Sequence, residues 1–214
     1  MEGKRFHHGP NAPSGLPAVV SKEVLEAKDA RWVKLHKLKW KDQTGKERLW
    51  ETAERTTRKG DVDAVDILPL LKSKGNPTKT VIITQFRPPI GGYCIELPAG
   101  LVDANESAEQ AAIRELKEEC GYHGKVVETS SVMFSDPGMS NANMKLVVLE
   151  VDLDDGCNAN PHPEFDEGEA IETLVVELRE LAGKIRELES KGYLVDARLA
   201  HMVAALDLMH RGLL

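Results

Sequence analysis

The chain has 214 residues, of which 41% are hydrophobic, and a formal net charge of −7 at pH 7. This length makes one domain the default, with room for a small accessory subdomain, and the hydrophobic content is sufficient for a buried core. The negative charge argues against general binding to nucleic acid, whose affinity depends on neutralising phosphates, and no apolar run is long enough to span a bilayer.

Residues 1–20 are rich in Gly, Pro, Asn and His, which predicts a disordered tail. The N-terminal region has no apolar h-region of a secretory signal. The three cysteines, Cys94, Cys120 and Cys157, are odd in number and lack the spacing of a metal site. They indicate reduced thiols, so we expect a cytoplasmic or nuclear protein.

The first regular structure is predicted to be a β-hairpin. Segments 31–40 and 49–57 have the character of strands, and residues 42–45 supply a turn ending in glycine. The alternation of the two strands leaves Trp32 and Trp50 in need of a partner. From the alternation alone, they are either ordinary half-buried tryptophans or ligand contacts.

Three further segments, 64–71, 80–86 and 93–97, are predicted to be strands because they are short, apolar and bounded by turn residues. Arg87 ends the second of them. A guanidinium at a strand end suits phosphate binding, and Arg55 is a second candidate for that task. Either arginine is alternatively a structural ion-pair partner.

Residues 108–120 are predicted to form a helix. Ser107 and Gln110 fit a capping box, so the helix begins just after Ser107, and Gly121 is suited to end it. The face expected to pack on the core carries side chains at four-residue intervals: Ala112, Leu116 and Cys120.

The neighbouring face of this helix carries a cluster of carboxylates. At about 100° per residue, Glu119 lies roughly 40° from Glu115, and Glu118 lies roughly 60° from Glu115 on the other side. Like charges at this spacing destabilise an isolated helix, and hard divalent cations are the usual reason for such a cluster. Arg114 is placed to orient one of these carboxylates by a bidentate contact.

Beyond the helix, segments 126–134, 145–153 and 170–176 are predicted strands. Residues 135–140 form a loop between the first two strands, and the polar residues 154–168 form an acidic loop before the third. The apolar spacing near the end of the chain predicts two helices, the second with Asp196 as its N-cap. We expect both helices to act only in packing. The fold class is then α/β, with a mixed sheet flanked by helices.

Residues 100–122 match the Nudix box, G-x5-E-x7-R-E-U-x-E-E-x-G-U, in which U is a bulky aliphatic residue. The matching positions are Gly100, Glu106, Arg114, Glu115, Leu116, Glu118, Glu119 and Gly121. The one departure is Tyr122 at the last aliphatic position, which is still bulky. The chain therefore resembles the Nudix hydrolases.

The resemblance covers roughly residues 20–210 and is closest to the ADP-sugar pyrophosphatase branch, which typically carries a proline fifteen residues beyond the box, as Pro137 is here. It implies a Nudix fold, an α/β/α sandwich with an N-terminal antiparallel sheet subdomain. The implied organisation is a tail over 1–20, a subdomain for dimerisation and adenine stacking over 21–60, and a hydrolase domain over 61–214. A homodimer is the implied assembly.

The implied activity is Mg²⁺-dependent hydrolysis of the diphosphate of ADP-sugars, chiefly ADP-ribose to AMP and ribose 5-phosphate. Two or three Mg²⁺ ions are expected, with Mn²⁺ as the other candidate cation. The implied metal and catalytic residues are Glu115, Glu118 and Glu119, with Arg114 beside them, the carbonyl of Ala99 and Glu169. Glu167 is the alternative to Glu169 for positioning the attacking water. Glu172 is less suited because it lies inside a predicted strand.

The resemblance also implies a set of substrate contacts. One tryptophan of each subunit sandwiches the adenine, the two being Trp32 and Trp50, and Glu51 accepts a hydrogen bond from the adenine amine. The other implied contacts are Arg55 and Arg87 on the diphosphate, Leu101 along the substrate and Asp136 at the sugar end. For Asp136, a plain Asp-Pro turn is the alternative.

Two alternatives to this function are open. The first is a Nudix hydrolase of another substrate, such as 8-oxo-dGDP, NADH or a dinucleoside polyphosphate, because aromatic stacking discriminates poorly among bases. The second is a non-catalytic binding module with the Nudix fold. Such a module should have lost ligands from the acidic cluster, which this chain retains in full.

Overall fold

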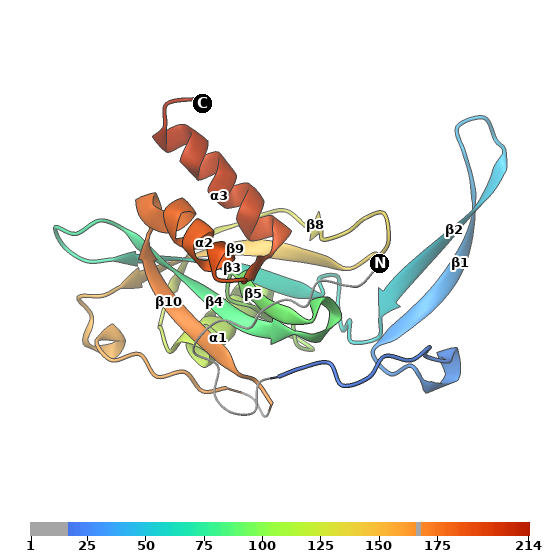
Figure 1. Cartoon of the computed structure of the whole chain (residues 1–214), viewed down its shortest axis with the longest axis horizontal. Helices are drawn as coiled ribbons and strands as arrows, with labels where there is room; N and C mark the ends of the chain where they lie inside the picture. Colours follow the sequence, from blue (N-terminus) through green and yellow to red (C-terminus); the bar gives the residue numbers. More distant parts are fainter. Residues whose placement is uncertain (1–16, 166–167) are drawn as a thin grey trace.

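The computed structural model describes residues 17–165 and 168–214 (Figure 1). Most of the tail expected over residues 1–20 therefore lies outside the described residues, and residues 17–20 are exposed and have no regular structure. In the described part of the chain, no helix combines the length and apolar character needed to cross a membrane.

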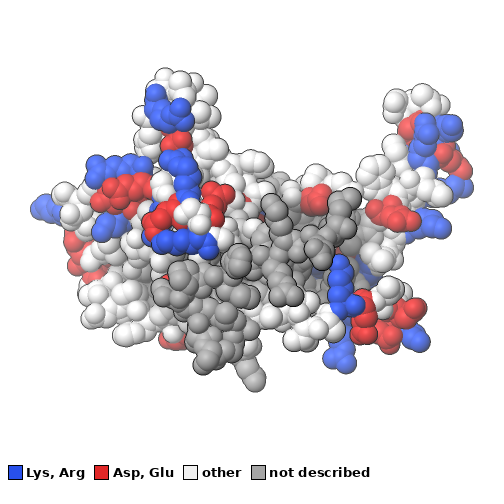
Figure 2. All heavy atoms as spheres, viewed as in Figure 1, with Lys and Arg blue, Asp and Glu red and all other residues white. Residues whose placement is uncertain are grey.

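The predicted hairpin is confirmed. It consists of β1 (Val33–Lys41) and β2 (Glu47–Arg55), is preceded by the short 3₁₀ helix η1 (Ala27–Asp29), and forms a separate two-stranded antiparallel sheet. The Asp42 carboxylate closes its turn by accepting hydrogen bonds from the backbone N–H groups of Thr44 and Lys46. The hairpin projects away from the rest of the molecule (Figure 1), and positive and negative side chains are intermixed on it (Figure 2).

The remaining strands form one mixed nine-stranded sheet. Its main path runs β11-β5-β4-β3-β9-β7, with β10 paired to β4, β6 to β3 and β8 to β9. The pairs β3–β9 and β11–β5 are parallel and the others antiparallel. The strands are β3 (Ala64–Lys72), β4 (Lys79–Arg87), β5 (Gly92–Glu96), β6 (Ala99–Leu101), β7 (Lys125–Thr129), β8 (Met133–Phe134), β9 (Asn143–Asp152), β10 (Ile171–Glu177) and β11 (Leu194–Val195).

Helices cover both faces of this sheet. The longer ones are α1 (Ala108–Cys120), α2 (Leu181–Ser190) and α3 (Ala197–His210), and the short 3₁₀ helices are η2 (Pro88–Ile90), η3 (Gly156–Asn158) and η4 (Leu178–Glu180). One buried cluster joins α1 to the sheet, and a second joins α2 and α3 to it. The predicted α/β/α arrangement is therefore confirmed.

The strand periodicity explains this division of the core. Val81 and Ile83 pack in the cluster under α1, whereas Ile82 between them packs under α2 and α3, because successive side chains of a strand point to opposite faces. The helix side of the first cluster includes Ala112, Leu116 and Cys120, and the predicted packing face of α1 is therefore confirmed.

One element differs from the prediction. The segment expected to be a single strand over 126–134 is split into β7 and β8. The pairing with β9 shifts register between Val126 and Glu128. Next to the break, the Ser130 hydroxyl rather than a backbone carbonyl accepts the N–H of Leu146. This side-chain bond interrupts the ladder, so the chain leaves the sheet and rejoins it at Met133.

Candidate active site

Helix α1 presents the acidic cluster, and both of its ends are capped as predicted. The Ser107 hydroxyl accepts from the Gln110 N–H, and the Gln110 side chain accepts from the Ser107 N–H, which completes the capping box. Gly121 at the C-terminal end adopts a left-handed conformation with φ of 73°, which glycine adopts at no steric cost.

Arg114 organises this face of the helix. Its Nε and Nη2 atoms form a bidentate pair with the Glu106 carboxylate, at 3.0 Å each. Its Nη1 atom bridges Glu115 at 2.8 Å and Glu118 at 2.9 Å, and Nη2 also donates to the Leu101 carbonyl. The predicted bidentate contact therefore exists, but its partner is Glu106, which leaves the two cluster carboxylates held by one shared nitrogen.

Glu119 is the buried member of the cluster, with only 4% of its surface exposed. Its carboxylate accepts the backbone N–H of Ala99 at 3.0 Å. Burial, with smaller contributions from Glu115 and Glu169, raises the pKa of Glu119 to about 8. Burial also raises the pKa of Glu115. These carboxyl groups are thus poorly suited to be charged together unless a cation compensates them.

Strand β6 brings the backbone against this cluster. The carboxylate of Glu115 lies over Gly100, where a Cβ atom would overlap it. The first glycine of the box is therefore needed because it lets the Glu115 carboxylate approach the β6 backbone, and not because it forms a turn. Ala99, predicted to offer its carbonyl to a metal, and Leu101, predicted to pack along the substrate, flank Gly100 and line the same pocket.

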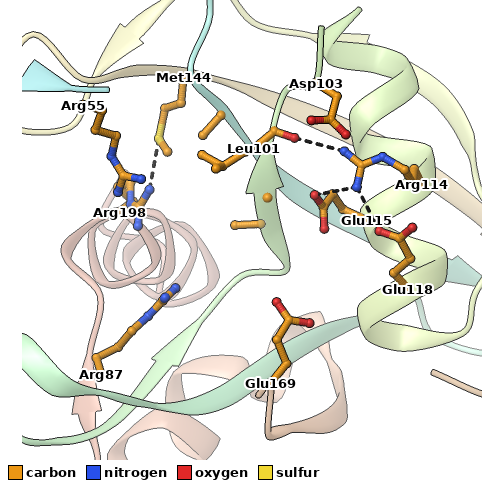
Figure 3. Close-up of a pocket in the computed structure, with 13 residues that line it drawn as sticks. Arg55, Arg87, Leu101, Asp103, Arg114, Glu115, Glu118, Met144, Glu169 and Arg198 are labelled. Carbon is orange, nitrogen blue, oxygen red and sulfur yellow. Dashed lines mark hydrogen bonds and ion pairs between the residues drawn. The ribbon is translucent and has the colours of Figure 1, made fainter. Parts of the chain in front are cut away.

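These groups open into a pocket of about 420 Å³ (Figure 3). One side carries Glu115, Glu118 and Arg114 of α1, and Arg55, Arg87 and Arg198 lie on the opposite side (Figure 3). The residues lining the pocket are Arg55, Ala64, Arg87, Ala99, Gly100, Leu101, Asp103, Arg114, Glu115, Glu118, Met144, Glu169 and Arg198.

Arg87 fits both interpretations that the sequence left open. It lines the pocket, and its Nε and Nη2 atoms also pair with the buried carboxylate of Glu96, with 2.7 Å between Nε and Oε1. The ion pair fixes the guanidinium at the end of β4 and leaves part of it exposed. Arg55, at the end of β2, also lines the pocket.

Glu169 lines the pocket as predicted, and it lies below Glu115 and Glu118 in the view of Figure 3. Its charge contributes to the raised pKa values of both Glu115 and Glu119, which places it close to them. The alternative, Glu167, lies outside the described residues. Glu172 lies within β10, 3.5 Å from the Thr84 hydroxyl, and is not among the described residues that line the pocket.

The other predicted substrate contacts lie outside this pocket. Trp32 and Trp50 are 70% and 49% exposed, and Glu51 is exposed on β2. Asp136 is exposed in the loop over residues 135–140, and its backbone carbonyl accepts from Met139 and Ser140. The indole N–H of Trp50 donates to the Gly138 carbonyl at 3.0 Å. The hairpin and this loop are therefore joined to each other, beside the pocket rather than inside it.

Of the four arginines among the described residues that line the pocket, Arg198 is the one that was not predicted from the sequence, and Ala64, Asp103 and Met144 were not predicted either. Arg198 is the second residue of α3, in a helix that was expected to act only in packing. The sequence did show an arginine two positions after the predicted N-cap Asp196. An N-cap predicts where a helix begins in the sequence, but it does not predict that this end of the helix lies at the pocket.

The donor chemistry fits a hard divalent cation. Within residues 17–165 and 168–214, no three histidine, cysteine, aspartate or glutamate side chains converge closely enough to enclose a metal ion by themselves. Mg²⁺ is usually held by one or two carboxylates, with water and substrate phosphates completing its shell. The buried Glu119, whose charged form is disfavoured by the partly buried Glu115, meets that requirement next to the backbone of Ala99.

The chain is similar to known enzymes along most of its length. The chain is 42% identical to the ADP-ribose pyrophosphatase of Saccharomyces cerevisiae, over 91% of this chain and 85% of the relative. It is 40% identical to the ADP-sugar pyrophosphatase of Mus musculus, over 86% of this chain and 85% of the relative.

The fold is also found among solved structures. A crystal structure of an ADP compounds hydrolase matches 99% of this chain and 97% of its own, with a TM-score of 0.56 and 19% sequence identity. The family model of the NUDIX domain matches residues 61–197. With the acidic box on α1 and the mixed sheet beneath it, this chain belongs to the Nudix family.

Proposed function

We propose that this protein hydrolyses the diphosphate bond of ADP-sugars, chiefly ADP-ribose to AMP and ribose 5-phosphate. The observation that carries the proposal is the approach of two helix carboxylates to the β6 backbone. Glu115 lies over Gly100 and lines a pocket whose opposite side carries arginines, and the buried Glu119 accepts the Ala99 N–H beside it. The names of the similar yeast and mouse enzymes support the substrate class.

Glu115, Glu119 and the Ala99 carbonyl would hold Mg²⁺, with Glu118 adding a ligand or a nearby charge and Glu169 completing the set. Bound there, two or three ions would neutralise the phosphate charge and lower the pKa of a water molecule. Arg114 supports this role from the protein side, because its contact with Glu115 and Glu118 limits how those carboxylates turn.

The remaining chemistry belongs to side chains of the pocket. Arg55 and Arg87 hold the diphosphate in line for attack, since a guanidinium binds phosphate oxygens through paired N–H groups. Arg87 is prepared for this by its ion pair with Glu96. Glu169, which lines the same pocket, positions the attacking water and accepts its proton.

We further propose that the functional unit is a homodimer in which two copies complete the adenine site. Trp50 lies opposite Leu38 of β1, which is six residues from Trp32, the residue just before that strand. At the rise of a strand this separation is roughly 20 Å, whereas an aromatic sandwich needs two rings about 7 Å apart. Because strand side chains stand nearly perpendicular to the sheet, Trp32 and Trp50 of one copy are too distant to sandwich a single base.

Turnover of ADP-ribose, ADP-mannose and 8-oxo-dGDP, each with Mg²⁺ and with EDTA, tests the proposed activity. We expect ADP-ribose to be cleaved fastest, with no cleavage in EDTA. The variant Glu119→Gln should keep the fold and lose turnover by a factor on the order of 10³ or more, because it loses a charged ligand. Preference for 8-oxo-dGDP would reassign the substrate, and wild-type-like turnover by Glu119→Gln would refute the metal role.

A further inference from the structure

Arg198 reaches the pocket from a different element than any other residue of the site. It stands at the start of α3 and lines the pocket together with Arg55 and Arg87. The three guanidinium groups lie on the side of the pocket opposite Glu115 and Glu118 (Figure 3). Arg114 belongs to the acidic side, so three guanidinium groups face the metal ligands, and two of them, Arg87 and Arg198, are held by carboxylates behind them.

Two aspartates fix the orientation of Arg198 in advance. Its Nε and Nη2 atoms form a bidentate pair with Asp196, at 2.8 Å each. Its Nη1 atom donates to the buried carboxylate of Asp66 at 3.1 Å and contacts the Met144 sulfur at 3.1 Å. Asp196 also caps α3 through the Arg198 N–H. A cation held in this way loses little conformational entropy when an anion arrives.

The exposure of Arg198 argues against a role as counter-ion alone. Asp66 is almost completely buried, but 37% of the Arg198 side chain is exposed and it lines the pocket. A thioether is a weak acceptor, so the Nη1 donor facing Met144 is readily transferred to a stronger acceptor. A partly exposed guanidinium that can release this donor, in a pocket with two other arginines, is a site for phosphate oxygens.

We propose that Arg198 is a third diphosphate-binding residue, supplied by the C-terminal helix and held in place by Asp66 and Asp196. This inference rests on the proposed function, since it assumes that the pocket receives a nucleoside diphosphate. It makes α3 part of the substrate site, beyond the packing role expected from its sequence.

Binding of ADP and of adenosine, measured by calorimetry in EDTA, tests this proposal without relying on catalysis. For Arg198→Met we expect the Kd of ADP to rise by roughly 10- to 100-fold, the range for losing a hydrogen bond to a charged group. The Kd of adenosine, which has no phosphate, should change by less than about 2-fold. Arg211→Met at the far end of α3 is the matched control, and it should bind both probes as the wild type does.

Arg198→Met leaves Asp66 without its counter-ion, so the double variant Asp66→Asn/Arg198→Met is measured alongside it. We expect the double variant to bind ADP as weakly as the single variant. Three results would overturn the proposal: an unchanged Kd for ADP, an equal loss of adenosine binding, or recovery of wild-type ADP affinity in the double variant. If ADP binding weakens as expected but wild-type protein does not cleave ADP-ribose, the proposed function fails and the phosphate site stands.

Discussion

The carboxylate of Glu115 occupies the space where Gly100 would carry a side chain. We therefore expect Gly100→Ala to push this carboxylate out of the pocket. The far end of a glutamate side chain moves easily, so the fold should survive. Turnover should fall about 100-fold or more, because a displacement of roughly 1 Å at a reacting centre has that effect.

Steady-state kinetics and thermal unfolding separate these two effects. Gly156→Ala is the control, because nothing lies within 4 Å of its added Cβ. It should leave turnover unchanged. Full activity in Gly100→Ala would mean that the observed position of Glu115 is not needed.

The raised pKa of Glu119 predicts that the metal-free protein loses stability as pH increases. Burial holds this pKa at about 8 in the folded state, against 4.5 for a glutamate exposed to water. The folded state thus binds the proton more tightly, and its advantage is lost as pH rises through the folded pKa. Between about pH 6 and pH 9 the group should remove about 2–3 kcal/mol from the free energy of unfolding.

Urea unfolding in EDTA at both pH values measures this loss. Glu119→Gln does not titrate, so it should be less sensitive to pH than the wild type by about the same 2–3 kcal/mol. Mg²⁺ should restore stability more strongly at the higher pH, where it competes with fewer protons. Identical pH profiles for the two proteins would show that Glu119 is not the titrating group.

The separation of Trp32 from Trp50 predicts complementation between two variants that bind the substrate weakly, measured at a substrate concentration below their KM. Trp32→Ala and Trp50→Ala should each raise the KM for ADP-ribose, since each loses one stacking partner. When the two are refolded together, mixed dimers contain one intact pair, and about a quarter of wild-type activity should return.

The control for this experiment mixes Trp32→Ala with the double variant Trp32→Ala/Trp50→Ala, in which no arrangement provides an intact pair. It should show no recovery. If the first mixture also shows no recovery while mixed dimers form, the adenine site lies within a single copy.

Gly121 predicts a stability effect that combines backbone strain with packing. Its φ is +73°, and a Cβ there would overlap the backbone of Pro161 and His162. Gly75 has a similar φ of +78° but open space around it. Gly75→Ala should therefore cost only the strain, about 1–2 kcal/mol, and Gly121→Ala distinctly more. Equal losses in denaturant unfolding would show that the contact with residues 161–162 adds nothing.

The sequence alone predicted the structures that depend on local bonds. The capping box of Ser107 and the stop at Gly121 bound a helix whose geometry is constant, so Glu115, Glu118 and Glu119 had to share a face. The hairpin followed in the same way from alternation and from the turn at Asp42. The prediction of one strand over 126–134 failed at Ser130, where the side-chain hydroxyl accepts the Leu146 N–H in place of a backbone carbonyl. The periodicity of apolar residues does not reveal such a side-chain bond.

Only the tertiary structure decided what faces the acidic helix. The Ala99 amide meets Glu119 because β6 pairs with β3 beside α1. Arg198 meets Asp66 across 132 residues of chain, an encounter that α3 makes possible by packing on the opposite face of the sheet from α1. Helix and turn signals extend over a few residues, whereas the direction of a distant guanidinium depends on how whole layers pack, and no local pattern encodes that.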